Sequence, residues 1–131
     1  MDANQALAEL LELTSQVERA VVLDASGTMV GSTEPEDGGQ GLVRAALDLL
    51  AAAGSLHSSA GEVTRAEVEL GEGGLFVLRE GGRTIAATTG PNPTSGLVSY
   101  DLRTCLQGIG EEKPKRRRAP RKAKDGDGED A

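Results

Sequence analysis

The chain has few of the residues on which catalytic and metal centres usually depend. Its 131 residues include one cysteine, one histidine, one tyrosine, one phenylalanine and no tryptophan. The single Cys105 excludes a disulfide within the chain and any cysteine-based metal cluster. No run approaches the roughly 18 apolar residues of a membrane-spanning helix, and the first residues lack the pattern of a secretion signal. We therefore expect a soluble, cytoplasmic protein without a membrane span.

Apolar residues are missing from one end of the chain. From Glu111 onward there is no Val, Leu, Ile, Met or aromatic residue. Such a segment cannot bury enough apolar surface to offset the entropy lost on ordering it. The sequence therefore predicts an interaction domain over 1–110 and a disordered charged tail over 111–131. In that tail, a basic block over 113–124 precedes an acidic block over 125–130.

Charge divides at the same boundary. The chain has 14 basic and 21 acidic residues, net −7. Residues 1–110 hold six of the basic and fifteen of the acidic residues, which makes this part −9. An acidic surface repels nucleic acid and anionic membranes and favours basic or apolar protein partners. The basic block of the tail can neutralise phosphates, and its candidate polyanion contacts are Lys115, Arg116, Arg117, Arg118, Arg121 and Lys122.

The apolar pattern predicts three helices and five strands. Residues 3–17 and 41–56 place apolar side chains at helical spacing, and a third helix is expected to begin at Asn92 as N-cap, with Pro93 in its first turn. Short Val-rich runs separated by glycine turns indicate strands, over 19–24, 28–32, 63–70, 74–79 and 83–89. The order αββαβββα predicts an α+β fold with a five-stranded antiparallel sheet and helices on both faces.

Two of these elements are expected to need a partner. The helix over 41–56 is apolar around most of its circumference, so it requires more than one packing surface. The strand over 63–70 alternates, with Ala66, Val68 and Leu70 facing one way and charged residues the other, as in an edge strand. In a domain of this size, the second surface is predicted to be another subunit.

Candidate reactive groups do not form a recognisable site. The stretch 27–33 has neither the spacing nor the lysine of a phosphate-binding loop. His57 lies beside two serines, but a nucleophile needs a base oriented by a third group across the fold. The acidic residues Glu34, Glu36 and Asp37 lie in a Pro-Gly loop without the spacing of a calcium-binding loop. We therefore predict no enzyme, no cofactor and no metal site.

The chain resembles the Roadblock/dynein-light-chain family over residues 4–109. The likeness is carried by the hairpin Ala20–Val30, with its Asp24 and Gly27, and by Asn92–Val98 leading to Leu102. The order of the elements and the three glycine-bounded strands also match. The resemblance implies a Roadblock-like fold with profilin-like layering. The tail has no counterpart in the family.

The resemblance also implies a function. Family members form homodimers through the third strand and second helix, and bacterial members are described as predicted regulators of Ras-like GTPases. The implied function is a non-catalytic homodimeric partner, regulator or scaffold of a Ras-like small GTPase. By this analogy, GTPase contacts are expected from Arg44 and Asp48, and the dimer interface from Leu42, Val43, Leu47, Val63, Ala66 and Val68.

Two other functions stay open at the level of sequence. One is a nucleic-acid-associated adaptor that grips phosphates with the basic tail. The other is a small-molecule sensor. Against the sensor, the sequence offers no convergent polar cluster, and its two aromatics, Phe76 and Tyr100, occupy core-like positions.

Overall fold

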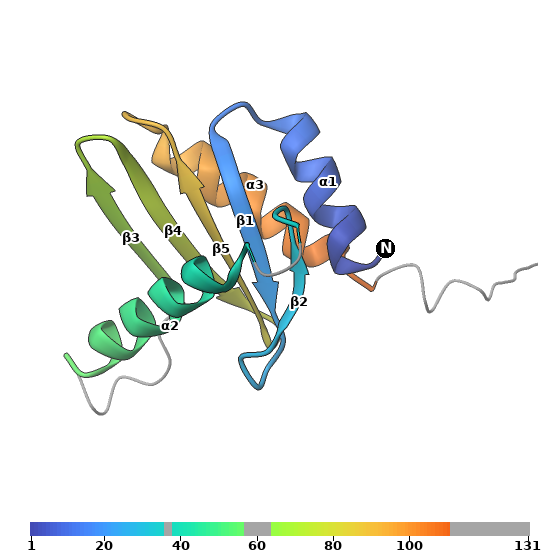
Figure 1. Cartoon of the computed structure of the whole chain (residues 1–131), viewed down its shortest axis with the longest axis horizontal. Helices are drawn as coiled ribbons and strands as arrows, with labels where there is room; N and C mark the ends of the chain where they lie inside the picture. The colour runs from blue at the N-terminus through green and yellow to red at the C-terminus, as the bar shows by residue number, and fades with distance from the viewer. Residues whose placement is uncertain (36–37, 57–63, 111–131) are drawn as a thin grey trace, which may run out of the picture.

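The protein is described by a computed structural model that covers residues 1–35, 38–56 and 64–110. Its helices and strands follow one another in the predicted order (Figure 1). They are α1 (Ala3–Leu13), β1 (Val17–Leu23), β2 (Met29–Ser32), α2 (Gln40–Gly54), β3 (Arg65–Leu70), β4 (Gly73–Glu80), β5 (Arg83–Thr89) and α3 (Ser95–Gly108).

The five strands form one antiparallel sheet in the order β2-β1-β5-β4-β3. The central strand β5 pairs Ala86 with Val21 on one side and with Val77 on the other. These three side chains are at most 1% exposed. The predicted α+β architecture is confirmed, and β3 is an edge strand as expected.

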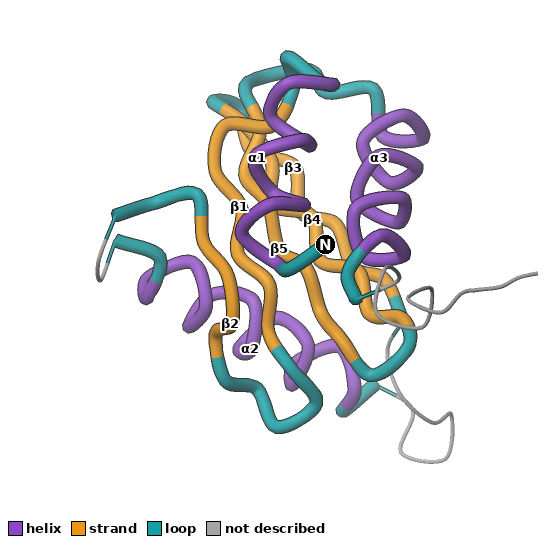
Figure 2. Tube along the Cα trace, turned by 90° about the vertical axis from the view of Figure 1, so that its right-hand side faces the viewer, coloured by secondary structure: helices purple, strands orange, loops and turns teal. Residues whose placement is uncertain are grey.

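Helices cover both faces of the sheet, but unequally. On one face, α1 and α3 pack against alternate residues of the strands, including Val22, Phe76 and Ile85. On the other face, α2 packs alone, through Val43, Ala46 and Leu50. Figure 2 shows the sheet between α2 on one side and α1 with α3 on the other. One face therefore receives two helices and the opposite face receives one.

Turn chemistry fixes the two hairpins at one end of the sheet. Gly81 and Gly82 adopt φ values of +63° and +81° between the paired residues Glu80 and Arg83. A two-residue hairpin of this kind needs positive φ at both positions, which glycine adopts without strain. In the other hairpin, Asp24 accepts bonds from the Ser26 and Thr28 backbone N–H groups at 2.9 and 3.0 Å. The hydrogen bond that the Ser26 hydroxyl donates at 2.7 Å, followed by these backbone bonds, lowers the pKa of Asp24.

The ends of two helices differ from the sequence predictions. The first helix ends at Leu13, because Thr14 is extended and Val17 already pairs with Thr89 in the sheet. The last helix does not start at Asn92, whose φ of +56° is left-handed. Its N-cap is Thr94, whose backbone N–H donates to the Gln16 side chain at 2.6 Å.

Tyr100 is a third correction. It was predicted at a core-like position but is 64% exposed on α3, whereas Phe76 is 3% exposed and belongs to the core. The apolar stripe of α3 is narrower than the sequence suggests, since Val98, Leu102, Cys105 and Leu106 face the sheet and α1. Among the described residues, no helix has both the length and the apolar content needed to cross a membrane.

The turn between β3 and β4 provides a stability test. A Cβ at Gly73 would collide with the backbone carbonyl of Thr89 at the end of the neighbouring strand β5, whereas a Cβ at Gly71 would meet open space. We expect Gly73→Ala to lower the free energy of unfolding by about 1–3 kcal/mol. The matched variant Gly71→Ala should stay within about 0.5 kcal/mol of the parent. Urea unfolding of both variants measures the difference, and equal stability of the two would contradict the close approach at Gly73.

Candidate functional site

The apolar side chains of α2 extend beyond the part of the sheet that the helix covers. Val43, Ala46 and Leu50 point into the core, with exposures of 8% or less. Leu42 and Leu49, on one flank of the helix, are only half-buried, and Ala45 on the same flank is exposed. The helix thus presents an apolar flank that nothing in the described part of the subunit covers completely.

Strand β3 continues this surface. Its pairing sets Ala66 opposite Val77 and Val68 opposite Leu75, and both partners belong to the core on the α2 side. Directly paired residues of antiparallel strands share a face, so Ala66, Val68 and Leu70 lie on the α2 face of the sheet. Ala66 and Val68 are half-buried, and Leu70 is 65% exposed.

A groove joins the two elements. It has a volume of about 500 Å³ and runs between α2 and the start of β4, with Leu42, Ala45, Leu70 and Leu75 among its walls and Arg19 and Glu72 also lining it. We call the set Leu42, Ala45, Leu49, Ala66, Val68 and Leu70 the α2/β3 surface. It combines an open sheet edge with exposed apolar side chains, which are features of protein-interaction sites.

The structure brings together part of the predicted dimer interface. Leu42, Ala66 and Val68 all belong to the α2/β3 surface. Val43 lies directly beneath it and is 8% exposed within the subunit. Leu47 lies on the opposite flank of α2, where it lines a separate hollow with residues 24–27 of the first hairpin. Val63 lies outside the described residues.

The predicted GTPase contacts occupy a different side of the same helix. Arg44 and Asp48 are four residues apart, so they are neighbours on one side of the helix, and both are exposed. Neither lines the groove. The predicted polyanion contacts Lys115, Arg116, Arg117, Arg118, Arg121 and Lys122 lie outside the described residues.

Four apolar residues of this region were not among the predicted interface residues: Ala45, Leu49, Leu70 and Leu75. The alternation of the strand did predict that Leu70 faces the same way as Ala66 and Val68, so its place on this surface follows from the spacing. Leu75 lies in a continuous apolar run that predicts a strand covered on both faces. The structure leaves it half-buried because α2 does not reach over the start of β4.

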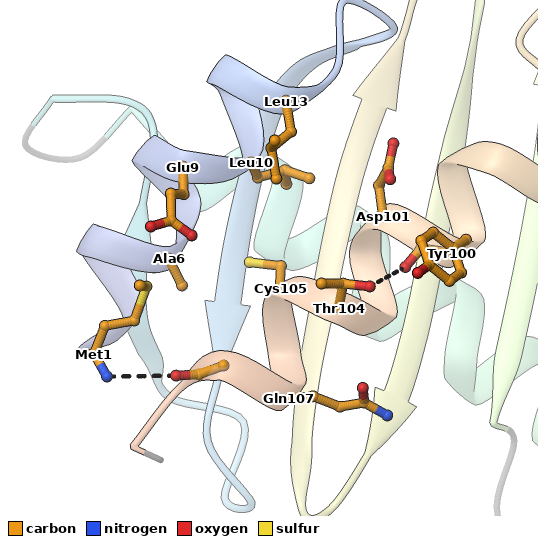
Figure 3. A pocket seen from close by; sticks show the side chains of 11 residues that line it. Met1, Ala6, Glu9, Leu10, Leu13, Tyr100, Asp101, Thr104, Cys105 and Gln107 are labelled. Atoms are coloured by element: carbon orange, nitrogen blue, oxygen red, sulfur yellow. Dashed lines mark hydrogen bonds between the residues drawn. The ribbon is translucent and has the colours of Figure 1, made fainter. Parts of the chain in front are cut away.

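Another hollow lies between α1 and α3, on the other side of the sheet (Figure 3). Its volume is about 550 Å³, and its walls include the exposed Leu13 and Tyr100 and the carboxylates of Glu9 and Asp101. At one end, the Met1 amino group donates to the Gly108 carbonyl at 3.4 Å. The hollow is lined by both termini of the domain rather than by a sheet edge.

Cys105 is the nucleophile nearest to this hollow, and it is held in an unreactive form. It points from α3 toward α1 (Figure 3) and is 7% exposed. Burial, with a smaller effect of the Glu9 charge, raises the pKa of the Cys105 thiol to about 11. Because the thiolate is the reacting form, this cysteine is protonated at neutral pH. In residues 1–35, 38–56 and 64–110, no group of three His, Cys, Asp or Glu side chains could hold a metal ion.

The fold and this surface define a class of protein. It is a three-layer α+β domain with two helices on one face of a five-stranded antiparallel sheet, a single helix on the other, and an open edge beside that helix. Solved structures of other proteins share this architecture.

The structure is similar to a Roadblock/LC7 domain from Streptomyces avermitilis, with a TM-score of 0.69 and 21% identity, covering 87% of this chain and 97% of that chain. A second Streptomyces Roadblock/LC7 domain is 27% identical, with a TM-score of 0.52 and coverages of 80% and 95%. The gliding protein MglB from Thermus thermophilus is 17% identical, with a TM-score of 0.68 and coverages of 83% and 86%.

These similarities confirm the Roadblock-like fold and support the relationship to the Roadblock family that the hairpin and final-helix motifs predict. No family model matches the sequence, and no curated protein matches it. The comparisons lend no support to the nucleic-acid alternative.

The environment of Cys105 predicts its reactivity. At pH 8, a pKa of about 11 instead of the ordinary 9.0 lowers the thiolate fraction about 100-fold. We expect iodoacetamide to alkylate the folded protein at least about 100-fold more slowly than the protein in urea.

A control variant shows whether burial of the thiol causes the slow alkylation. In Thr104→Cys/Cys105→Ser, the thiol moves by one residue to an exposed position. It should react in the folded protein at a rate close to that in urea. Fast alkylation of native Cys105 would show that the thiol is open to solvent.

Proposed function

We propose that this chain is a non-catalytic, homodimeric partner of a Ras-like small GTPase, acting as its regulator or scaffold. The observation that carries the proposal is the α2/β3 surface, where a sheet edge and an apolar helix flank lie side by side. The family resemblance assigns dimerisation to these same two elements. The α2/β3 surface needs a partner, and the family resemblance implies that the partner is a second copy of the chain.

A second copy of the chain would supply what the α2/β3 surface lacks, which is a strand to pair with β3 and cover for its apolar side chains. An edge strand leaves a row of backbone N–H and C=O groups for another strand to pair with. Leu70, at 65% exposure, and the exposed Ala45 would lose contact with water if a second copy packed there. Two-fold dimers that use the same patch on both subunits are the commonest protein oligomers. Val43 supports this patch from below, and Leu47 stays a predicted contact on the other flank of α2.

The proposed GTPase contact uses the outward side of α2. Arg44 and Asp48 are exposed there and do not line the groove, so they stay accessible if the α2/β3 surface is closed by a second subunit. A regulator of this kind needs no reacting group of its own. It can speed turnover by holding the GTPase's switch loops in a productive arrangement, or by supplying an arginine to the developing charge, and Arg44 is the first candidate.

The dimer interface is tested by Leu70→Lys. Leu70 is 65% exposed in the subunit, so the change should leave folding intact, while a lysine buried in the dimer would be unpaired. We expect the dimer dissociation constant to rise at least about tenfold in sedimentation experiments. Leu13→Lys, at a residue 70% exposed on α1, is the matched control and should leave the dimer unchanged. Parent protein that is monomeric at every concentration would contradict the homodimer.

The GTPase proposal is tested by capture from the native cytoplasm. The full chain is immobilised and incubated in parallel with a GTP analogue and with GDP. We expect a Ras-like GTPase to be retained in one nucleotide state. Arg44→Ala with Asp48→Ala should reduce retention at least about fivefold, because both contacts are lost.

The control for this capture is Arg103→Ala on α3, whose exposed pair with Glu80 at 3.0 Å is distant from α2 and contributes little to stability. It should retain as much GTPase as the parent protein. Equal retention by the Arg44 and Asp48 variant would place the GTPase contact elsewhere, and failure to retain any GTPase would contradict the proposed function.

A further inference from the structure

Strand β3 presents its free backbone groups at three known positions. The Arg79 backbone N–H donates to the Thr64 carbonyl at 2.9 Å, and the register of β3 and β4 pairs Arg65 with Leu78. Hydrogen-bonded pairs alternate along an antiparallel ladder. The residues that bond to β4 are therefore Thr64, Ala66, Val68 and Leu70. The backbone N–H and C=O groups of Arg65, Glu67 and Glu69 point away from β4, toward the open edge.

These same three residues carry all the charges of the strand. Arg65 and Glu67 lie opposite Leu78 and Phe76, which belong to the core on the α1/α3 side. Their side chains, and that of Glu69, therefore lie on the face opposite α2, and all three are exposed. Any strand that bonds to this edge meets one positive and two negative charges at its hydrogen-bonded positions.

A second copy can pair with this edge only in a few registers. A two-fold axis perpendicular to the sheet makes the two β3 strands antiparallel and keeps both α2 helices on the same face. Opposite charges then face each other in two registers. Arg65 lies opposite either Glu67 of the partner subunit or Glu69 of the partner subunit.

Like charges decide between these registers. When Arg65 faces Glu69 of the partner subunit, Glu67 must face Glu67 of the partner subunit across the axis. Like charges placed directly opposite destabilise a strand pair. When Arg65 faces Glu67 of the partner subunit, both attractive pairs form and no like charges face each other among the described residues of β3.

We propose that β3 pairs with β3 of a second copy in the register that places Arg65 opposite Glu67 of the partner subunit. The inference rests on the proposed homodimer and adds the register and charge pattern by which the two copies recognise each other. Ala66 then lies at the two-fold axis, on the α2 face. At a non-hydrogen-bonded pair the strands bring side chains closest together, and a methyl group is small enough for that position.

The charges around this axis alternate. Within one subunit, the Arg65 guanidinium already lies 4.0 Å from the Glu67 carboxylate. The second copy adds two pairs of the same kind across the seam, so each charge has two neighbours of opposite sign. A network of this kind contributes more than an isolated exposed pair.

Charge reversal tests the register without disturbing the core. Arg65→Glu makes the two cross-strand pairs acidic, and Glu67→Arg makes them basic. We expect each variant alone to raise the dimer dissociation constant about tenfold or more. A mixture of the two should form a heterodimer with an affinity within about threefold of the parent, because both pairs are then of opposite charge. Sedimentation and native mass spectrometry measure the two affinities.

Glu69→Arg is the matched control, since it reverses the same charge two residues along the same strand. In the proposed register it leaves the two Arg65–Glu67 pairs intact, so its homodimer should match the parent. Weakening by Glu69→Arg, with rescue by Arg65→Glu, would overturn this register and leave the homodimer standing. A parent dimer that none of the three variants affects would overturn pairing through β3. A monomeric parent would overturn the homodimer itself.

Discussion

The unequal cover of the two faces of the sheet is the constraint on which the α2/β3 surface depends. The pair α1 and α3 fills one face, and their core cluster extends over β1, β5 and β4. The single helix α2 crosses the strands of the other face and contacts β1, β5 and β3 (Figure 1). A helix with its side chains is about 10 Å wide, while a strand of seven residues is about 23 Å long, so α2 covers only part of the length of the strands. The part that it leaves open includes Leu70 at the end of β3 and the first residues of β4.

The residues beside the uncovered part of the sheet are apolar. The flank of α2 that borders the groove carries the apolar residues Leu42, Ala45 and Leu49. A helix flank that faces solvent normally carries polar residues instead. Strand β3 is apolar toward α2 and charged on its other face. This alternation is typical of an antiparallel strand with one face packed and the other toward solvent. The proposed dimer would complete the layer that α2 begins, and it would leave the outward side of α2 for a GTPase.

Much of the fold could be predicted from the sequence. Apolar residues recur at the spacing of strands and of helices, and glycines mark the turns between the strands. The hairpin at Gly81-Gly82 and the edge position of β3 follow directly from such signals. The start of α3 could not be predicted, because the left-handed conformation of Asn92 and the bond from Thr94 to Gln16 depend on a loop distant in sequence. Tyr100 was misplaced because it lies two residues from both Val98 and Leu102, which face the core, and therefore on the opposite side of α3.

The candidate surface was only partly predictable for a related reason. Apolar periodicity in α2 showed that the helix needs two packing surfaces, but it did not show which flank borders the groove beside β4. Leu42 and Leu47 therefore look equivalent in sequence, and the tertiary structure separates them. The register of β3 on β4 also decides which backbone groups point outward, and that depends on the two-residue turn at 71–72.

The most direct test of the account is amide hydrogen exchange along β3, followed by NMR in the full chain at a concentration where association is complete. The amides of Ala66 and Val68 bond to β4 and should be protected in any case. If β3 pairs with a second copy, the outward-pointing amides of Glu67 and Arg65 should be protected to a similar degree. They should lose that protection on dilution. Rapid exchange of these two amides beside a protected Ala66 and Val68, at every concentration, would contradict pairing through β3.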